Sequence, residues 1–262
     1  MTLRTTALRR AAYVCTIAVL SACVTPVERQ RIETFVRKSS KGLTTIELDY
    51  LLYLPPGYDA PDARERRWPL LLFLHGIGEC GSNPNEVARL GPPKRVEQGE
   101  DFPMIIVSPQ NDGRLRKLWW NDLLIALLDH LETELRIDPD RVYLTGASLG
   151  GFGAWNLACV HPERFAAVAP VCGWGYPAEV RRMQDIPVWA FHGGEDWIVP
   201  IEEGRAMVDA LRDAGGSARF TVYDDVGHGA WHRAYRDPEL YEWLLAQRRG
   251  TAPGNGSTNR DP

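Results

Sequence analysis

The sequence of 262 residues lacks the features that define several classes of protein. It has no internal repeat, which argues against solenoids and propellers. Its five cysteines and six histidines do not form the Cys/His clusters that bind zinc, so no metal or cofactor is predicted. An excess of positive charge is also absent, because the net charge is −4. Nucleic acid is therefore not an expected partner.

A long apolar run is absent near the N-terminus as well. The apolar stretch from Ala11 to Leu20 is too short to span a bilayer as a permanent helix. It follows a positive segment that contains Arg4, Arg9 and Arg10. Residues 1–22 therefore predict a secretory signal peptide.

The residue after this segment predicts a lipid anchor. Leu20-Ser21-Ala22-Cys23 resembles the bacterial lipobox, in which cleavage precedes a cysteine that carries lipid. An ordinary signal peptide with an accidental cysteine is the alternative. Without the three arginines of residues 1–22 the net charge falls from −4 to −7, so the lipid would hold the protein at the membrane. Val24 stands where an aspartate would favour the inner membrane, which indicates the outer membrane and periplasm if the host has them.

Few cysteines remain after this processing. Cys80, Cys159 and Cys172 permit at most one internal disulfide. We expect buried thiols, with a Cys159–Cys172 bond as the lesser alternative.

The most informative stretch is Gly146-Ala147-Ser148-Leu149-Gly150. It has the pattern G-x-S-x-G, after an apolar strand-like run and before a helical pattern. The turn is so sharp that side chains two residues before and after the serine would collide, so both positions need glycine. This context predicts Ser148 as a nucleophile exposed at the edge of a sheet.

A nucleophilic serine needs a base and an acid that orients the base. Asp196 follows the apolar run 186–192 in a glycine-rich loop, and His228 follows the next strand-like run, 218–223. The order serine, acid, histidine favours these two residues. Glu195 is the rival acid and His232 the rival base. Asp224 and Asp225 lie too close to His228 in sequence and are interpreted as turn residues.

The oxyanion of the transition state also needs donors. The backbone N–H of Leu149, directly after the nucleophile, is one candidate. The loop His75-Gly76-Ile77-Gly78 follows the apolar run 68–74 and offers the N–H of Ile77, or less favourably that of Gly78.

Together these segments resemble the α/β-hydrolase superfamily. The resemblance rests on FLHGIGE at 73–79, GASLGG at 146–151, His192-Gly193 with Asp196, and Gly227-His228 with Trp231. Within the superfamily the chain is similar to phospholipase/carboxylesterase and dienelactone-hydrolase-like proteins, including polyhydroxybutyrate-depolymerase-like and feruloyl-esterase-like ones. The resemblance implies a serine carboxylic ester hydrolase with the triad and donors named above. Cys80 in the oxyanion loop departs from the family pattern.

Strand-like and helical segments alternate, so we expect an α/β fold with a doubly wound, mainly parallel sheet. The predicted division is a signal peptide (1–22), an anchored tether and first strand region (23–44), a catalytic domain (45–249) and a disordered tail (250–262). The connection between the runs 166–171 and 186–191 is too short for a large lid domain. The site should therefore be open to small or polymer-borne esters.

Aromatic residues are frequent in the predicted loops. Five tryptophans fall at or near the expected site: Trp119, Trp120, Trp174, Trp197 and Trp231. They are candidate substrate-binding residues, although buried packing at loop bases is the commoner role of tryptophan. Two other functions stay open: a serine peptidase of the prolyl-oligopeptidase type, and a non-catalytic binding lipoprotein. The intact triad argues against the second.

Overall fold

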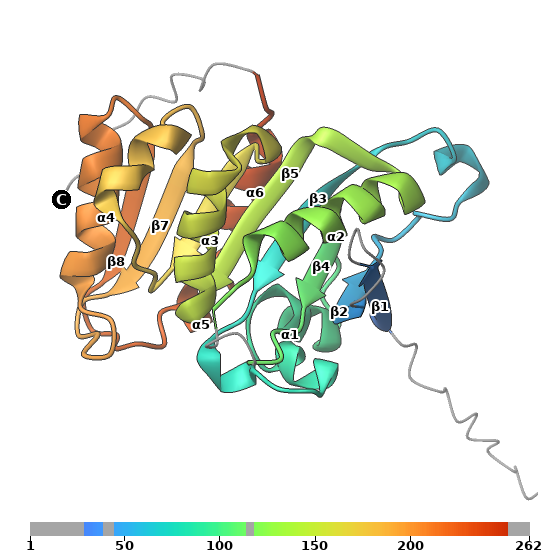
Figure 1. Cartoon of the computed structure of the whole chain (residues 1–262), viewed down its shortest axis with the longest axis horizontal. Coiled ribbons are helices and arrows are strands. Elements are labelled where there is room, and N and C mark those ends of the chain that lie inside the picture. Colours follow the sequence, from blue (N-terminus) through green and yellow to red (C-terminus); the bar gives the residue numbers. More distant parts are fainter. Residues whose placement is uncertain (1–28, 39–44, 114–117, 251–262) are drawn as a thin grey trace, which may run out of the picture.

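The computed structural model describes residues 29–38, 45–113 and 118–250. The predicted signal peptide, Cys23 and the segment from residue 251 onward lie outside the described residues. The described chain forms one eight-stranded sheet with helices on both faces (Figure 1).

The sheet has the order β1-β2-β4-β3-β5-β6-β7-β8. In chain order the strands are β1 (Arg31–Lys38), β2 (Thr45–Tyr53), β3 (Trp68–Leu74), β4 (Ile105–Pro109), β5 (Ile137–Ala147), β6 (Ala167–Val171), β7 (Val188–Gly193) and β8 (Ala218–Tyr223). The pairs β1–β2 and β2–β4 are antiparallel, and the other five pairs are parallel. The prediction of a doubly wound, mainly parallel sheet is confirmed.

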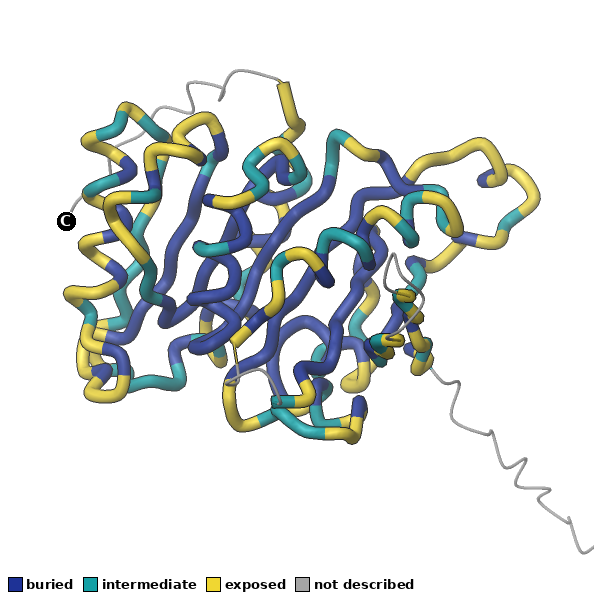
Figure 2. The backbone as a smooth tube through the Cα atoms, in the orientation of Figure 1, coloured by how far each residue is buried: buried dark blue, intermediate teal, exposed yellow. Residues whose placement is uncertain are grey.

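The helices cover the sheet because its central strands are apolar on both sides. Every residue of β3 is buried, and Figure 2 shows the central strands as continuously buried while exposed residues follow the outer sides of the helices. The helices are α1 (Gly91–Glu97), α2 (Asn121–Glu134), α3 (Leu149–Val160), α4 (Ile201–Asp213), α5 (Trp231–Ala234) and α6 (Pro238–Ala246). Helices α2, α3 and α4 pack on one face, and α1, α5 and α6 on the other.

No helix in the described ranges is long and apolar enough to span a membrane. The connection from β6 to β7 contains only a short 3-10 helix, η5 (Pro177–Met183), so this part of the described chain adds no lid domain.

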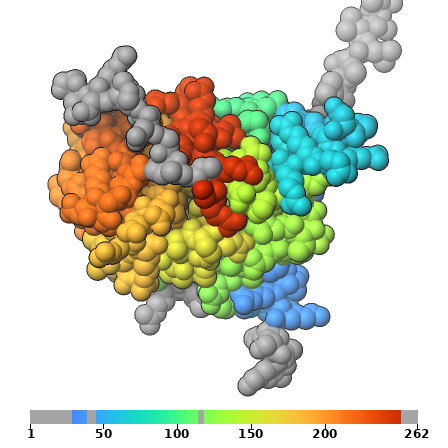
Figure 3. Space-filling view, turned by 90° about the horizontal axis from the view of Figure 1, so that it is seen from above, coloured from blue at the N-terminus to red at the C-terminus, as the bar shows by residue number. Residues whose placement is uncertain are grey.

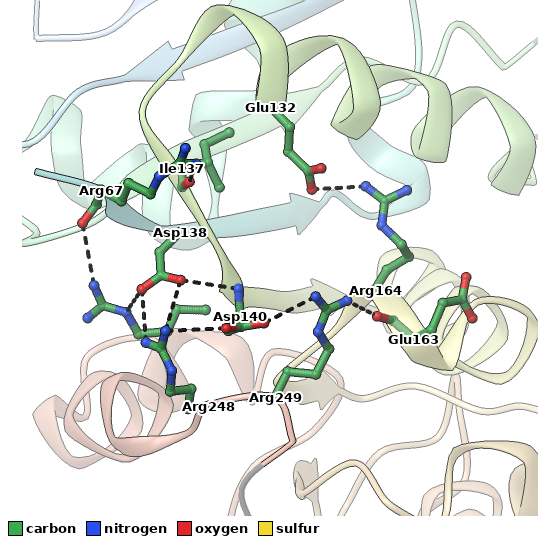
Figure 4. Close-up of polar contacts among 10 residues, drawn as sticks. Arg67, Glu132, Ile137, Asp138, Asp140, Glu163, Arg164, Arg248 and Arg249 are labelled. Carbon is green, nitrogen blue, oxygen red and sulfur yellow. Dashed lines mark hydrogen bonds and ion pairs between the residues drawn. The ribbon is translucent and has the colours of Figure 1, made fainter. Parts of the chain in front are cut away.

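Ion pairs connect chain segments at the amino ends of the parallel strands. Arg248 bonds the Asp138 carboxylate at 3.0 Å, and Arg249 bonds Asp140 at 3.2 Å (Figure 4). Arg141 adds a 2.8 Å bond to Asp138. Figure 3 views this edge and shows the last part of the chain, in red, lying across its middle. The end of the described chain is thereby fixed to the start of β5.

Candidate active site

The glycines of the serine turn are required by close backbone contacts. A Cβ on Gly146 would lie 2.3 Å from the carbonyl oxygen of Gly150, and one on Gly150 would lie 1.8 Å from that of Leu74. Ser148 between them has φ 56° and ψ −114°, a conformation that non-glycine residues rarely adopt. The turn therefore places Ser148 at the junction of β5 and α3, as the sequence predicts.

The structure brings the three predicted triad residues together. Nε2 of His228 lies 2.8 Å from Oγ of Ser148, and its Nδ1 lies 2.8 Å from Oδ2 of Asp196. Because a carboxylate only accepts hydrogen bonds, Nδ1 carries the proton and Nε2 is left to accept one from the serine. These side chains come from the carboxyl ends of β5, β7 and β8, at the lower edge of the sheet in Figure 1.

The acid is buried and its second oxygen is also bonded. Oδ1 of Asp196 accepts the backbone N–H groups of Ile198 and Val199, each at 3.0 Å. The side chain of Asp196 has no solvent exposure. Bonds to both oxygens keep the carboxylate oriented toward His228.

The rival residues lie outside this arrangement. Glu195 is exposed, and Asp225 forms an ion pair with Arg233 at 2.6 Å. His232 lies in α5, where its ring packs against Trp231. His228 and His232 stand at a four-residue spacing that also occurs in helical zinc sites, but Nδ1 and Nε2 of His228 are both bonded within the triad.

The predicted oxyanion donors are the first residues of two helical segments. Ile77 begins the 3-10 helix η2 (Ile77–Glu79), and Leu149 begins α3. The N–H groups at the start of a helix have no partner within it, so they are available to an anion. The loop adjoins the nucleophile, since a Cβ on Gly76 would lie 3.7 Å from Cβ of Ser148.

His75 supports this loop from beneath. Its Nδ1 lies 2.6 Å from the carbonyl oxygen of Gly76, and its Nε2 accepts the backbone N–H of Asn111 at 2.9 Å. Both bonds are satisfied by a neutral ring. Burial lowers the pKa of His75 to about 4, which keeps the ring neutral near pH 7. The neutral ring thereby joins the loop that carries Ile77 to the chain after β4.

The far end of the loop borders a hollow of about 460 Å³. The Gln110 amide donates to the carbonyl oxygens of Glu79 and Gly81 at 2.6 and 3.1 Å, which joins the loop to the chain after β4. Gln110, Gly81, Trp119 and Trp120 line the hollow, but no triad residue does. Cys80 in the same loop donates weakly to the Gly76 carbonyl oxygen at 3.9 Å.

The five candidate tryptophans differ in exposure. Trp119 is buried beneath the loop and packs edge-on against His75, whereas Trp197 is 83% exposed directly after Asp196. Trp174 stacks on Phe152 of α3. Trp231 packs edge-on against the His228 ring at 5.1 Å between ring centroids. Trp120 is exposed at the rim of the hollow.

The cysteines of the described residues form no disulfide. Cys159 and Cys172 are buried thiols, as expected. Burial raises the pKa of Cys159 to about 11 and that of Cys172 to about 12, so neither is a reactive thiolate at neutral pH.

Sequence reasoning missed one cluster because its members are separated along the chain. The donor atoms of Cys172, His192 and Asp196 lie within 4.8 Å of one another, and all three residues are buried. Such a set could in principle hold a metal ion. Here the His192 Nε2 faces the carbonyl oxygen of Val199 at 2.9 Å and Asp196 bonds His228, so these donors are already engaged.

Comparison with known proteins adds independent information. The sequence model of the family described as "Putative esterase" matches residues 44–249. "Putative esterase NocK" of Nocardia uniformis subsp. tsuyamanensis is 43% identical over 193 residues, covering 68% of this chain and 54% of that protein. "Probable feruloyl esterase C" of Aspergillus terreus is 26% identical over 174 residues, covering 64% and 62%.

A solved structure, "Crystal Structure of a Thermostable Esterase", matches with a TM-score of 0.70 at 30% identity. The match covers 83% of this chain and 63% of that one. The chain thus spans less than two thirds of the length of each of these three proteins.

Proposed function

This chain belongs to the esterase family of the α/β-hydrolase superfamily, and from that premise we propose that it is a serine hydrolase that cleaves carboxylic esters through an acyl-enzyme intermediate. The observation that carries the proposal is the pair of 2.8 Å bonds that link Ser148 to His228 and His228 to Asp196. Relatives named as esterases support the same reaction class.

In this mechanism His228 is the base. Its Nε2 accepts the Ser148 proton while Oγ forms a bond to the ester carbonyl carbon. The carbonyl oxygen becomes an oxyanion, which accepts the N–H groups of Ile77 and Leu149. As the C–O bond to the alcohol breaks, protonated His228 donates its proton to the leaving oxygen. Water then attacks the acyl-serine by the same route and releases the acid.

Asp196 holds the His228 ring in the tautomer that these reaction steps require. With Nδ1–H bonded to the carboxylate, the free lone pair of Nε2 faces the serine. The buried carboxylate also stabilises the imidazolium that forms after proton transfer.

The triad defines the reaction, and the side chains around it select the substrate. We propose that accessible aromatic residues contact the substrate, with the exposed Trp197 and the half-buried Trp174 favoured over the buried Trp119. An open edge with exposed aromatic rings suits aryl esters or esters carried on a polymer.

The test uses the purified chain that begins after residue 22. We expect hydrolysis of p-nitrophenyl acetate and labelling of one serine by a fluorophosphonate probe. Ser148→Ala should lose several orders of magnitude in kcat and all labelling, because the nucleophile is absent. His232→Ala is the matched control and should keep kcat within about tenfold of the parent.

The outcome that would sink the proposal is an active Ser148→Ala protein or a label on another residue. An aminoacyl-p-nitroanilide assayed in parallel distinguishes the peptidase alternative. Preference for the anilide over the ester would assign the same triad to peptide hydrolysis.

We further propose that the protein is exported and anchored in the bacterial cell envelope by lipid on Cys23. The support is the sequence around Cys23, which lies outside the described residues. Radiolabelled palmitate should mark the parent and not Cys23→Ser, and only the parent should stay with membranes after a high-salt wash. A parent that takes up no palmitate would refute the anchor without affecting the esterase proposal.

A further inference from the structure

A buried thiol and a second imidazole contact the acid of the triad. His192, the second-last residue of strand β7, places Nε2 3.5 Å from Oδ2 of Asp196. The Cys172 thiol, directly after β6, belongs to the same buried cluster, in which the Cys172 sulfur, a His192 ring nitrogen and an Asp196 carboxylate oxygen lie within 4.8 Å of one another. The side chains of His192 and Asp196 are 1% and 0% exposed, so solvent does not compete for these contacts.

The surroundings of His192 fix its protonation. Its Nε2 lies 2.9 Å from the carbonyl oxygen of Val199. A carbonyl oxygen only accepts, so Nε2 carries the proton. Burial lowers the pKa of this imidazole, which keeps it neutral. The one N–H therefore bonds the carbonyl oxygen of Val199, and it also lies beside Oδ2 of Asp196 at 3.5 Å, so a neutral His192 turns the polar N–H side of its ring to the acid.

The His192 ring cannot move away from the acid. A Cβ on Gly204 of α4 would lie 2.6 Å from its Nδ1. The helix backbone thus packs directly on the ring, which is possible because residue 204 is glycine. The opposite side of the ring faces Val199 and Asp196.

Cys172 occupies a position where glycine would be easier to place. Its φ is 47°, and among the described residues Ser148 is the other non-glycine residue with a positive φ. The thiol that this strained backbone carries lies within 4.8 Å of a carboxylate oxygen of Asp196. Burial raises the pKa of this thiol to about 12, so it stays protonated and its S–H group is available to the carboxylate beside it.

We propose that His192 and Cys172 are positioning residues of the acid, which hold Oδ2 of Asp196 toward His228 and withdraw part of its negative charge. This inference rests on the proposed function of the triad. Oδ1 is held by two backbone N–H groups, but without this pair Oδ2 would keep a single donor, His228. A buried carboxylate with an under-bonded oxygen can rotate and misdirect the base.

The pair also changes how strongly the acid attracts a proton to His228. Donors on Oδ2 spread its charge, so they weaken the stabilisation of imidazolium. Removing a donor should therefore move the acidic limb of the kcat/KM profile to higher pH. The titratable groups around the carboxylate are His228, Cys172 and His192, with Glu202 of α4 acting on His192.

The experiment compares variants that remove a donor with variants that keep one. His192→Leu and Cys172→Ala should lower kcat by about ten- to a hundredfold with KM within about twofold, because orientation rather than binding is lost. In both, the midpoint of the acidic limb should rise by about half a pH unit. His192→Gln and Cys172→Ser keep an N–H or O–H donor and should return kcat to within about threefold of the parent.

Gly204→Ala tests the same contact without altering either donor. Alanine normally stabilises a helix relative to glycine, but here its methyl group meets the His192 ring. We expect kcat to fall and the pH midpoint to rise as in His192→Leu. Glu203→Ala, at an exposed neighbouring position of α4, is the matched control and should leave both unchanged.

A proton NMR readout keeps the inference independent of esterase activity. The proton between His228 Nδ1 and Asp196 should give a far-downfield resonance that shifts in His192→Leu and Cys172→Ala. If the parent hydrolyses no ester, the proposed function fails, and a shifted resonance would still support the positioning role. An unshifted resonance, or reduced kcat with an unmoved pH midpoint in folded variants, would overturn it.

Discussion

At the scale of single residues, His75 links the oxyanion loop to acid stability. Its pKa is about 4 in the folded protein and about 6.5 in an unfolded chain. Below pH 6.5 the unfolded state binds a proton that the folded state refuses, so the free energy of unfolding falls as the pH is lowered from 6.5 to 4. Above pH 6.5 His75 is neutral in both states and takes nothing from the free energy of unfolding.

We therefore predict that His75 alone accounts for about 3 kcal/mol of the stability lost between pH 7 and pH 4. Urea midpoints of the parent and of His75→Gln at both pH values provide the measurement. Glutamine also offers a donor and an acceptor but does not titrate. The stability that the variant loses between pH 7 and pH 4 should therefore be smaller than that of the parent by this amount. Equal losses in the two proteins would contradict the prediction.

The sequence was sufficient to predict the triad contacts because each residue follows a strand in a recognisable order. Ser148, Asp196 and His228 meet as expected. It could not predict the contact of Cys172 and His192 with Asp196, because strands β6 and β7 bring them together only in the sheet. The glycine at 204 was a usable signal, since a helix interior rarely favours glycine.

At the scale of elements, the start of helix α6 can be predicted from the sequence. Asp237 before Pro238 predicts an N-cap, and the Asp237 side chain accepts the backbone N–H of Glu239 at 3.0 Å. The sequence pattern also predicts helices over residues 121–135 and 201–214, and the observed α2 and α4 each end one residue earlier. These helices carry clear caps or long apolar periodicity.

We predict that Asp237→Ala lowers the free energy of unfolding by about 1 kcal/mol, since a cap bond to a free N–H of the first turn is lost. Asp237→Asn keeps the acceptor and should lower the free energy of unfolding by only a few tenths of a kcal/mol. Thermal melts at neutral pH measure both. An alanine variant as stable as the asparagine variant would show that the cap does not contribute.

The bounds of β1 and the existence of α1 were not predicted, although β1 falls inside the predicted first strand region (23–44). In β1 only Phe35 is buried, because the strand lies at the sheet edge, so its apolar alternation is weak. In α1 two prolines follow Gly91 and resemble a turn, although proline is well tolerated in a first helical turn. Both cases reflect tertiary position rather than local propensity.

At the scale of the whole molecule, the triad lies at the carboxyl ends of the parallel strands. The ion pairs of Arg248 and Arg249 lie at the opposite, amino ends (Figure 1). Although burial opposes it, hydrogen bonds from Arg141 and Arg248 hold the pKa of Asp138 below its usual range. Its contribution to stability is present above about pH 4 and is lost as the carboxylate protonates at lower pH.

We predict that the double variant Arg248→Ala/Arg249→Ala is only slightly less stable than the parent at pH 7, because both arginines are partly exposed and solvent screens their ion pairs. Its kcat should be unchanged. Arg182→Ala breaks a more exposed pair with Glu179 and serves as the control, with an effect below about 0.5 kcal/mol. A large loss of kcat in the double variant would show that the two edges are coupled.

The strand order also sets how the molecule comes apart. β5, which carries the nucleophile, has a neighbour on each side, whereas β8, which leads to the base, is an edge strand. Edge elements fray at lower free energy than central ones. Partial unfolding should therefore detach the base while the serine turn is still intact. In rising urea, esterase activity should disappear before the far-UV signal of the sheet, and amides of β8 should exchange with deuterium sooner than those of β5.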